Sequence, residues 1–124
     1  MERRIFGNGL ALNGCWDGPV RFAFTERTGG VSLPPYASLN LGSHVGDDPA
    51  AVAENRRRVL ASLGADALQE RLLVPNQVHG DTVVCVAPSD VEDLARVRER
   101  RAAGADAVVC TARDVPVLMC YADC

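Results

Sequence analysis

The chain has 124 residues, of which 48% are hydrophobic and 23% are charged, and its formal net charge is −3. These proportions are typical of a globular protein and exclude a disordered, collagen-like or coiled-coil chain. No apolar run approaches the ~18 residues that a membrane-spanning helix needs. The length predicts a single domain, residues 1–124. Five cysteines without a CxxC pair, and no leading apolar stretch, favour a reduced, cytoplasmic protein.

All 13 basic residues are arginines, which excludes chemistry that depends on a lysine, such as a Schiff base or a P-loop. The arginine clusters at residues 56–58 and 96–101 stand beside acidic residues in helical patterns, as solvated helix faces do. The acidic net charge also argues against a phosphate backbone as the partner. We therefore expect neither nucleic acid nor a membrane as a partner, and the sequence indicates no oligomeric state.

Three elements are predicted in the first half of the chain. Residues 20–24 alternate apolar and polar side chains, which predicts a strand with its apolar face inward. The paired glycines that follow end this strand, and an extended loop is expected after them. Asp48 as N-cap, Pro49 at the first helical position and Gly64 beyond the end predict a helix. Its apolar face is formed by Val52, Val59, Leu60 and Leu63.

The second half is predicted to hold more strands and a weaker helix. Residues 72–74 indicate a strand, and Gly80 with Asp81 predicts a hairpin turn between Val78 and residues 83–86, with His79 at its rim. Residues 90–101 predict a helix. Residues 107–111 and 115–121 are apolar runs typical of buried strands, and Cys85 and Cys110 are predicted core residues. Together the elements predict an α/β (α+β) fold with mixed β-sheet layers flanked by helices.

Few residues indicate chemistry by themselves. An imidazole at His79 and a thiolate at Cys124 are good zinc ligands, but on spacing alone a rim histidine and a buried cysteine are the commoner case. The glycine-rich stretch beginning at Arg27 could form an anion-binding nest with the guanidinium. It lacks the spacing of a P-loop or dinucleotide fingerprint, so an ordinary turn is the favoured alternative.

A series of motifs resembles one known family. Residues 25–32, TERTGGVS, resemble the TxRxGGxS signature of the laccase-domain, or polyphenol-oxidase-like, proteins, now mostly described as zinc-dependent purine nucleoside phosphorylases. Five further blocks resemble that family in the expected order: residues 38–48, 52–56, 77–80 (QVHG), 105–107 and 122–124. Together the six blocks cover nearly the whole chain and match the N-terminal half of a family member.

The resemblance implies a metal site. The family binds one metal through a histidine, a cysteine and a second histidine, and His79 and Cys124 match the first two. The third belongs to an HAGWRG-like block that follows later in the family. The chain is therefore expected to be an incomplete part of the domain, truncated after the second ligand. Zinc is the expected metal, and copper is possible because a cysteine ligand is soft.

The resemblance also implies an activity and roles for site residues. It implies a transferase that cleaves adenosine, inosine or methylthioadenosine with phosphate, and a hydrolase that deaminates adenosine. Purine nucleoside and phosphate are thus the expected partners. Arg27, with Ser32 and the glycine turn, is the candidate for phosphate binding and catalysis, and Asn40 for hydrogen bonds to the nucleoside. Asp123 could orient the site or act as acid or base, and a structural role in ending its strand is an equal alternative.

Two other functions stay open. A copper-dependent polyphenol oxidase on the same fold ranks lower, because one mononuclear site does not supply the several coppers needed to reduce dioxygen to water. The third possibility is a catalytically inactive fragment that lacks the third metal ligand.

Overall fold

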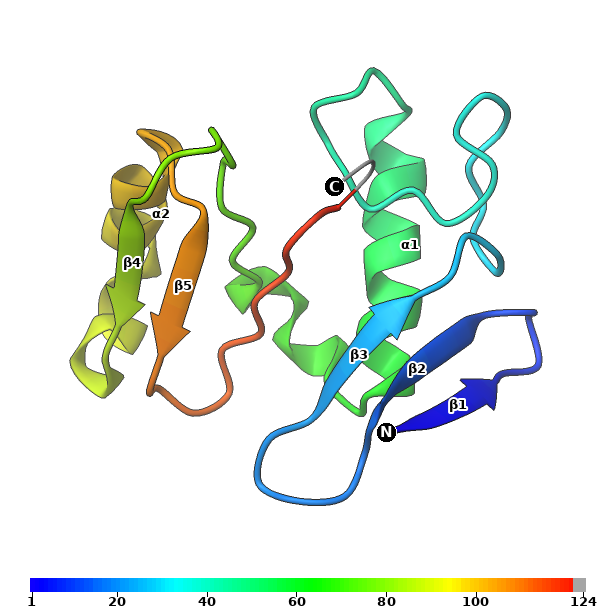
Figure 1. Cartoon of the computed structure of the whole chain (residues 1–124), viewed down its shortest axis with the longest axis horizontal. Coiled ribbons are helices and arrows are strands. Elements are labelled where there is room, and N and C mark those ends of the chain that lie inside the picture. Colours follow the sequence, from blue (N-terminus) through cyan, green and yellow to red (C-terminus); the bar gives the residue numbers. More distant parts are fainter. Residues whose placement is uncertain (122–124) are drawn as a thin grey trace. The chain divides into compact units, whose positions relative to one another are not determined.

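Helices and both parallel and antiparallel strands make up the chain in the computed structural model, which describes residues 1–121 (Figure 1). The predicted α/β fold class is confirmed. The chain divides into two compact units, Met1–Gln69 and a second unit from Glu70 onward. The assignment of residues 1–124 to one domain stays a prediction. Within the described residues, no helix is long and apolar enough to cross a membrane.

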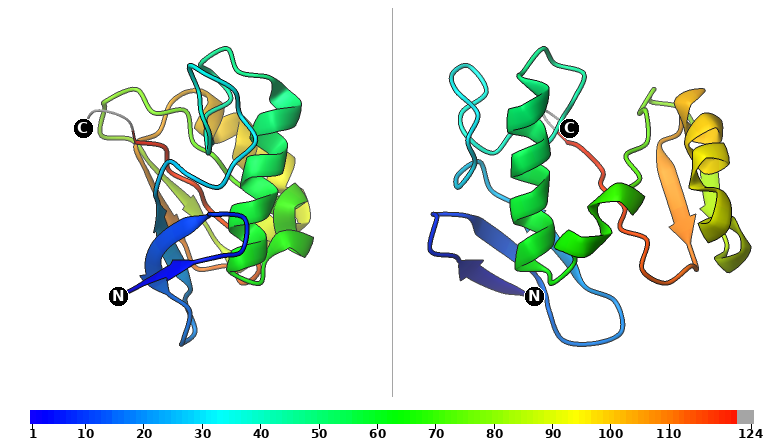
Figure 2. Two further views of the ribbon diagram at one scale, coloured as in Figure 1. Left: turned by 90° about the vertical axis from the view of Figure 1, so that its right-hand side faces the viewer. Right: turned by 180° about the vertical axis from the view of Figure 1, so that it is seen from behind.

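The first unit is a three-stranded antiparallel sheet with one long helix. Strands β1 (Glu2–Ile5), β2 (Ala11–Cys15) and β3 (Phe22–Thr25) lie in the order β1-β2-β3. Helix α1 (Pro49–Ser62) lies along one side of this sheet (Figure 2). Gly14 allows β2 and β3 to approach closely, because a Cβ there would stand 2.2 Å from the carbonyl oxygen of Phe22. Leu10, Ala11 and Leu12 are buried and form the apolar core at β2.

Helix α1 begins and ends where the sequence predicts. The Asp48 carboxylate accepts a hydrogen bond from the amide of Ala50 at 3.0 Å and so caps the helix, and Pro49 takes the first helical position. Leu63 is the C-cap, and Gly64 follows with a φ of +72°, a conformation that favours glycine. The predicted apolar residues Val52, Val59 and Leu60 are buried.

The apolar face predicted for residues 20–24 does not face inward. Val20 is 70% exposed and Phe24 59% exposed, and the rings of Phe22 and Phe24 make an edge contact at 6.4 Å on this outer face. Side chains alternate across a strand, and the small Ala23 occupies the half-buried side. The strand is confirmed and the choice of its buried face is wrong.

The second unit is built around a parallel strand pair. Strand β4 (Val83–Val86) pairs in parallel with β5 (Ala107–Cys110). The connection contains the 3-10 helix η2 (Pro88–Asp93) and helix α2 (Leu94–Ala102), since parallel strands need a crossover. Another 3-10 helix, η1 (Asp66–Arg71), precedes the unit's core. That core consists of residues that are at most 6% exposed: Leu73, Val84, Val86, Val97 and Ala105.

The helix predicted over residues 90–101 is thus confirmed in its second part, and its first turn is 3-10 instead of α-helical. The hairpin predicted around Gly80 and Asp81 is wrong. The partner of β4 is β5, so a sequential turn is replaced by a longer crossover. Residues 72–74 and 115–121 are not strands either, because a single parallel bridge joins Leu73 to Val117.

The burial predicted for Cys85 and the C-terminal apolar runs needs correction, whereas Cys110 packs against the core as predicted. In β4, Val84 and Val86 face the core, so Cys85 points the other way and is exposed. In β5, Val109 is 53% exposed while Cys110 is partly buried, so β5 is only half covered. The run 115–121 is likewise half-buried at most, because Leu73 is its backbone partner on one side only.

Candidate active site

His79 lies in a tight loop just before β4. It is exposed, and its φ of +58° is unusual for a residue other than glycine. The carboxylate of Asp106, just before β5, accepts hydrogen bonds from three successive loop amides. Val78 and His79 donate to Oδ1 at 3.0 and 2.9 Å, and Gly80 donates to Oδ2 at 2.7 Å. Because parallel strands β4 and β5 start at the same edge, residues 27 positions apart in the chain meet there.

These amides change the acidity of Asp106. The hydrogen bond from the Gly80 amide, followed by those from His79 and Val78, holds the pKa of Asp106 below its usual value of 3.8. The carboxylate is therefore ionised at neutral pH, and charge-assisted bonds of this kind are stronger than neutral ones.

The other predicted metal ligand, Cys124, lies outside the described residues, and so does Asp123. The chain leading toward them is placed, however. The Gln77 side-chain oxygen accepts a hydrogen bond from the Cys120 amide at 3.2 Å. Residues 77 and 120 are thus neighbours, which sets the segment four residues before Cys124 beside the His79 loop.

Only part of the implied metal site lies within the described residues, because Cys124 does not. Within residues 1–121, no three histidine, cysteine or acidic side chains gather into a group that could hold an ion. His79 itself fits the role of a ligand, because its imidazole is exposed while its backbone is fixed by Asp106. An imidazole of this kind suits zinc or copper.

In the first unit, a buried polar network brings two predicted site residues together. Its centre is Asn55 on α1, which is completely buried. Its Oδ1 accepts from the amide of Val31, and its Nδ2 donates to Ser32 Oγ and to the carbonyl of Asn40, all at 2.8 Å. All hydrogen-bonding groups of the Asn55 amide therefore have partners, as a buried amide requires.

Asp47 also binds both Ser32 and Asn40. Its Oδ2 accepts from Ser32 Oγ at 2.5 Å and from Asn40 Nδ2 at 3.1 Å. The hydrogen bond from Ser32, and then that from Asn40, lower the pKa of Asp47. Ser32 is 4% exposed and its hydroxyl proton is given to an ionised carboxylate, whose charge disfavours an anion at that hydroxyl. The phosphate-binding role of Ser32 and the nucleoside-binding role of Asn40 stay predictions.

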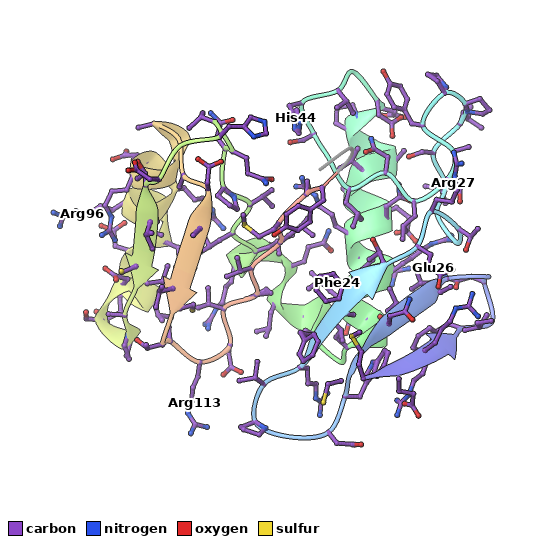
Figure 3. The ribbon with its side chains drawn as sticks, in the orientation of Figure 1. Phe24, Glu26, Arg27, His44, Arg96 and Arg113 are labelled. Atoms are coloured by element: carbon purple, nitrogen blue, oxygen red, sulfur yellow. The ribbon has the colours of Figure 1, made fainter. Side chains whose placement is uncertain are left out.

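Arg27, in contrast to Ser32 and Asn40, is not part of this buried network. It is exposed (Figure 3), and its guanidinium makes one long hydrogen bond, 3.4 Å, to the carbonyl of Ala37. Among the described residues it forms no ion pair. The amides of the following turn are already bonded inside the protein: Gly30 to Ser38 Oγ, Val31 to Asn55 and Ser32 to the Ser38 carbonyl. These three amides therefore have partners within the protein, and the guanidinium is the group that can meet an anion.

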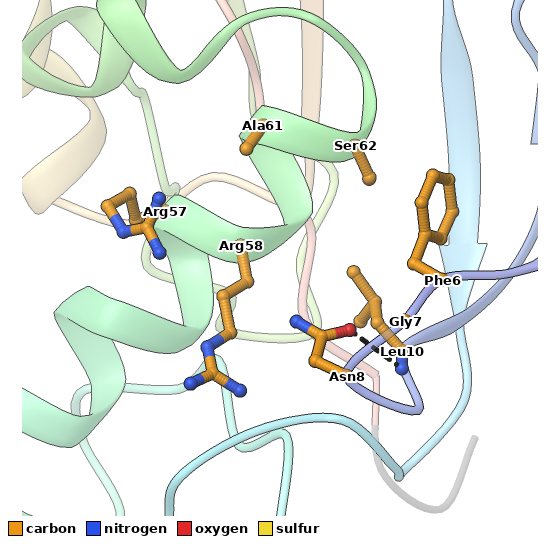
Figure 4. A pocket seen from close by; sticks show the side chains of 8 residues that line it. All are labelled: Phe6, Gly7, Asn8, Leu10, Arg57, Arg58, Ala61 and Ser62. Atoms are coloured by element: carbon orange, nitrogen blue, oxygen red, sulfur yellow. Dashed lines mark hydrogen bonds between the residues drawn. The ribbon is translucent and has the colours of Figure 1, made fainter.

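A separate shallow pocket of about 410 Å³ lies in the first unit (Figure 4). It is lined on one side by residues 6–8 and Leu10 and on the other by α1, including Arg57 and Arg58, and contains none of the predicted site residues. Both arginines already pair with Glu54, at 2.7 and 3.1 Å. Two guanidinium groups share this one carboxylate, so this side of the pocket keeps a single net positive charge.

Three residues that support the candidate site have roles that sequence reasoning did not assign: Asn55, Asp47 and Asp106. One signal was present for the first, since Asn55 lies three positions after Val52 and four before Val59, on the buried stripe of the helix. Asp47 stands directly before the N-cap Asp48, but it binds Ser32 and Asn40 and does not cap the helix. For Asp106, the hints were its place directly before an apolar strand and its position in the 105–107 block of the resemblance.

Comparison with known proteins identifies the family. A family model described as multi-copper polyphenol oxidoreductase laccase matches residues 21–124. A purine nucleoside phosphorylase of Corynebacterium glutamicum is 42% identical over 108 residues, which are 86% of this chain and 40% of that protein. The purine nucleoside phosphorylase YfiH of Escherichia coli is 40% identical over 108 residues, 85% of this chain and 43% of that protein.

The solved structures agree. The crystal structure of the hypothetical protein YfiH of Bacillus licheniformis matches with a TM-score of 0.70 and 28% identity, covering 98% of this chain and 45% of that one. The chain thus spans less than half the length of the relatives it matches. The match over residues 21–124 and these identities confirm the resemblance carried by the six motifs, and the chain belongs to the family described as multi-copper polyphenol oxidoreductase laccase.

Proposed function

We propose that this chain is part of a metal-dependent purine nucleoside phosphorylase, which cleaves adenosine, inosine or methylthioadenosine with phosphate and also deaminates adenosine. The relatives named purine nucleoside phosphorylase, at 40–46% identity, support the first activity. Among the structural observations, one supports the phosphorylase activity most. Arg27 is an exposed guanidinium without a carboxylate partner among the described residues, in the motif for which the resemblance implies phosphate binding.

Arg27 can both bind and assist in this reaction. In phosphorolysis, a phosphate oxygen forms a bond to the ribose C1′ while the bond from C1′ to the base nitrogen breaks, and the base takes up a proton. A guanidinium can hold two phosphate oxygens at once and fix the attacking oxygen in line with the leaving base. We assign Arg27 this catalytic role. Ser32 is the proposed second residue on the phosphate side, where phosphate would have to replace Asp47 as the acceptor of its hydroxyl proton, and Asn40 is the proposed contact to the nucleoside.

The proposed metal ligands are His79 and Cys124. A zinc ion with three protein ligands and an open position acts as a Lewis acid and makes bound water acidic, which suits deamination; copper is the alternative metal. The hydrogen bond between Gln77 and Cys120 supports this pairing, since it sets the chain leading to Cys124 beside the His79 loop. Asp123, next to Cys124, is proposed to orient the site or move a proton.

The test is a coupled assay on the full-length, zinc-loaded protein. Inosine should yield hypoxanthine only when phosphate is added, and adenosine should yield inosine without phosphate. Arg27→Ala should raise the KM for phosphate about 10- to 100-fold, the range expected when a hydrogen-bonded charge is lost. Arg113→Ala, which removes an exposed arginine of the second unit, is the matched control and should leave that KM unchanged. Absence of hypoxanthine at any phosphate concentration would refute the proposal.

A copper-dependent polyphenol oxidase is the second candidate, favoured by the description of the family model itself. Oxidation of a phenol that requires added copper, together with no nucleoside cleavage, would establish it in place of the first. The third candidate, an inactive fragment, is tested by comparing lengths. If the 124-residue chain is inert while the full-length protein turns over inosine, the chain by itself is inactive.

A further inference from the structure

The loop that carries His79 is held by residues just before β5. The Ala105 amide donates to the carbonyl of Asn76 at 2.8 Å, and the Asp106 amide donates to that of Thr82 at 3.1 Å. These two backbone bonds fix both ends of the loop. Between them, the Asp106 carboxylate accepts the three amides of residues 78–80 at 2.7–3.0 Å. The whole loop from residue 76 to residue 82 is thus attached to two adjacent residues that directly precede β5.

This attachment explains an otherwise unfavourable backbone conformation. The left-handed region is disfavoured for a residue with a Cβ, and His79 occupies it with a φ of +58°. Three successive amides that point at one carboxylate require the chain to curl in this way. Gly104 completes the fit, because a Cβ at that position would stand 2.9 Å from Cγ2 of Val78.

We propose that Asp106 is the positioning residue of the metal site: by binding the three amides, it fixes the direction in which the His79 imidazole leaves the backbone. The inference rests on the proposed function in taking His79 as a ligand. Asp106 binds no metal in this account and contacts no substrate. Its effect is to reduce the conformations of the ligand loop before the metal arrives, which raises affinity by preorganisation.

A purely structural turn would show the same hydrogen bonds, so the test needs a readout at the imidazole. The chain has two histidines, His79 and His44, and both are exposed. Zinc is added to the full-length protein, which the resemblance expects to hold the third ligand, while the imidazole signals of His79 and His44 are followed by NMR, and His44 serves as the internal control. In the same samples, hydrogen exchange of the amides of residues 78–80 reports whether the loop is held.

The variants are Asp106→Asn and Asp106→Ala, with Asp81→Asn as the matched control. Asp81 is an exposed carboxylate within the same loop, so its loss removes the same charge without removing the amide bonds to Asp106. We expect Asp106→Asn to weaken zinc binding at His79 about 10-fold or more, as loss of a residue that orients a ligand does. It should also speed exchange of the amides, whereas Asp81→Asn should change neither. Asp106→Asn keeps one acceptor oxygen, so it tests the idea even if Asp106→Ala does not fold.

Each outcome bears directly on the positioning role proposed for Asp106. Amides 78–80 that exchange equally fast in the wild type and in both Asp106 variants would overturn the proposal, because the loop is then not held. Faster exchange with unchanged zinc affinity would also overturn it, since Asp106 would then be structural only. No zinc effect on His79 in the wild type would remove His79 as a ligand and with it the metal part of the proposed function. Protection lost in Asp106→Asn would still show, in that case, that Asp106 holds the His79 loop.

Discussion

Asn55 is the residue whose loss should damage the first unit most. Replacing it by alanine removes the hydrogen bonds to Val31, Ser32 and Asn40 together, at a side chain that is completely buried. Each such bond contributes about 1 kcal/mol to the free energy of unfolding. Alanine regains roughly 0.5 kcal/mol through its higher helix propensity. Asn55→Ala should therefore lower the free energy of unfolding by about 2–3 kcal/mol.

The chain contains a convenient reporter for this change. Trp16 is its only tryptophan, and its indole N–H donates to the carbonyl of Ser62, the last residue of α1, at 2.9 Å. Tryptophan fluorescence during urea unfolding thus follows the separation of the helix from the sheet. The control is Asn76→Ala, which replaces an exposed asparagine. It should change the free energy of unfolding by no more than about 0.5 kcal/mol.

A second substitution separates hydrogen bonding from volume. Asn55→Asp keeps an oxygen to accept from Val31, but it cannot donate to Ser32 or Asn40 and places a charge in a buried site. It should be at least as destabilising as Asn55→Ala although it is almost the same size. A loss below about 0.5 kcal/mol in both variants would refute the reasoning that this network holds the loops to α1.

Three further predictions concern other contacts. The Arg3 guanidinium holds the pKa of Glu26 at about 2, so this pair stabilises the fold fully above the usual value of 4.5 and loses its effect as the pH falls toward 2. Glu26→Gln should reduce the loss of stability between pH 4.5 and about 2 in acid unfolding, and an unchanged curve would contradict the pairing. Gly14→Ala forces a Cβ to within 2.2 Å of the Phe22 carbonyl and should cost about 1–3 kcal/mol in urea unfolding; a wild-type midpoint would show that the strands are farther apart. Cys85 is exposed and should react with a thiol reagent before the half-buried cysteines do, as mass spectrometry can map; slow labelling would mean that β4 turns its other face outward.

Local signals in the sequence predicted helix α1 accurately. Asp48, Pro49 and Gly64 each act on the residues next to them, so no knowledge of the rest of the fold is needed. The burial of β3 could not be predicted in the same way. Alternation shows that a strand has two different faces, but which one is covered depends on what packs there, and Ala23 instead of Phe22 and Phe24 faces inward.

The pairing of β4 failed for a related reason. A glycine and an aspartate between apolar residues predict a hairpin as readily as they predict the loop before a crossover. Asp106 distinguishes the crossover loop from a hairpin. Its carboxylate accepts hydrogen bonds from the amides of residues 78–80, which in a hairpin would lie in the turn and the first strand. That partner is far along the chain. The motifs placed His79, Arg27 and Ser32 in a candidate site, and distant polar side chains determine how His79 and Ser32 are held.

The candidate site residues therefore fall into two kinds, with different consequences for experiment. Ser32 and Asn40 are bound by Asn55 and Asp47, so a substitution at any of these four changes stability as well as activity, and activity alone cannot assign their roles. Arg27 contributes one long hydrogen bond to the fold, so its loss should leave stability almost unchanged. An effect of Arg27→Ala on phosphate binding can consequently be attributed to the guanidinium itself. That makes Arg27 the position at which the proposed phosphorolysis is tested most directly.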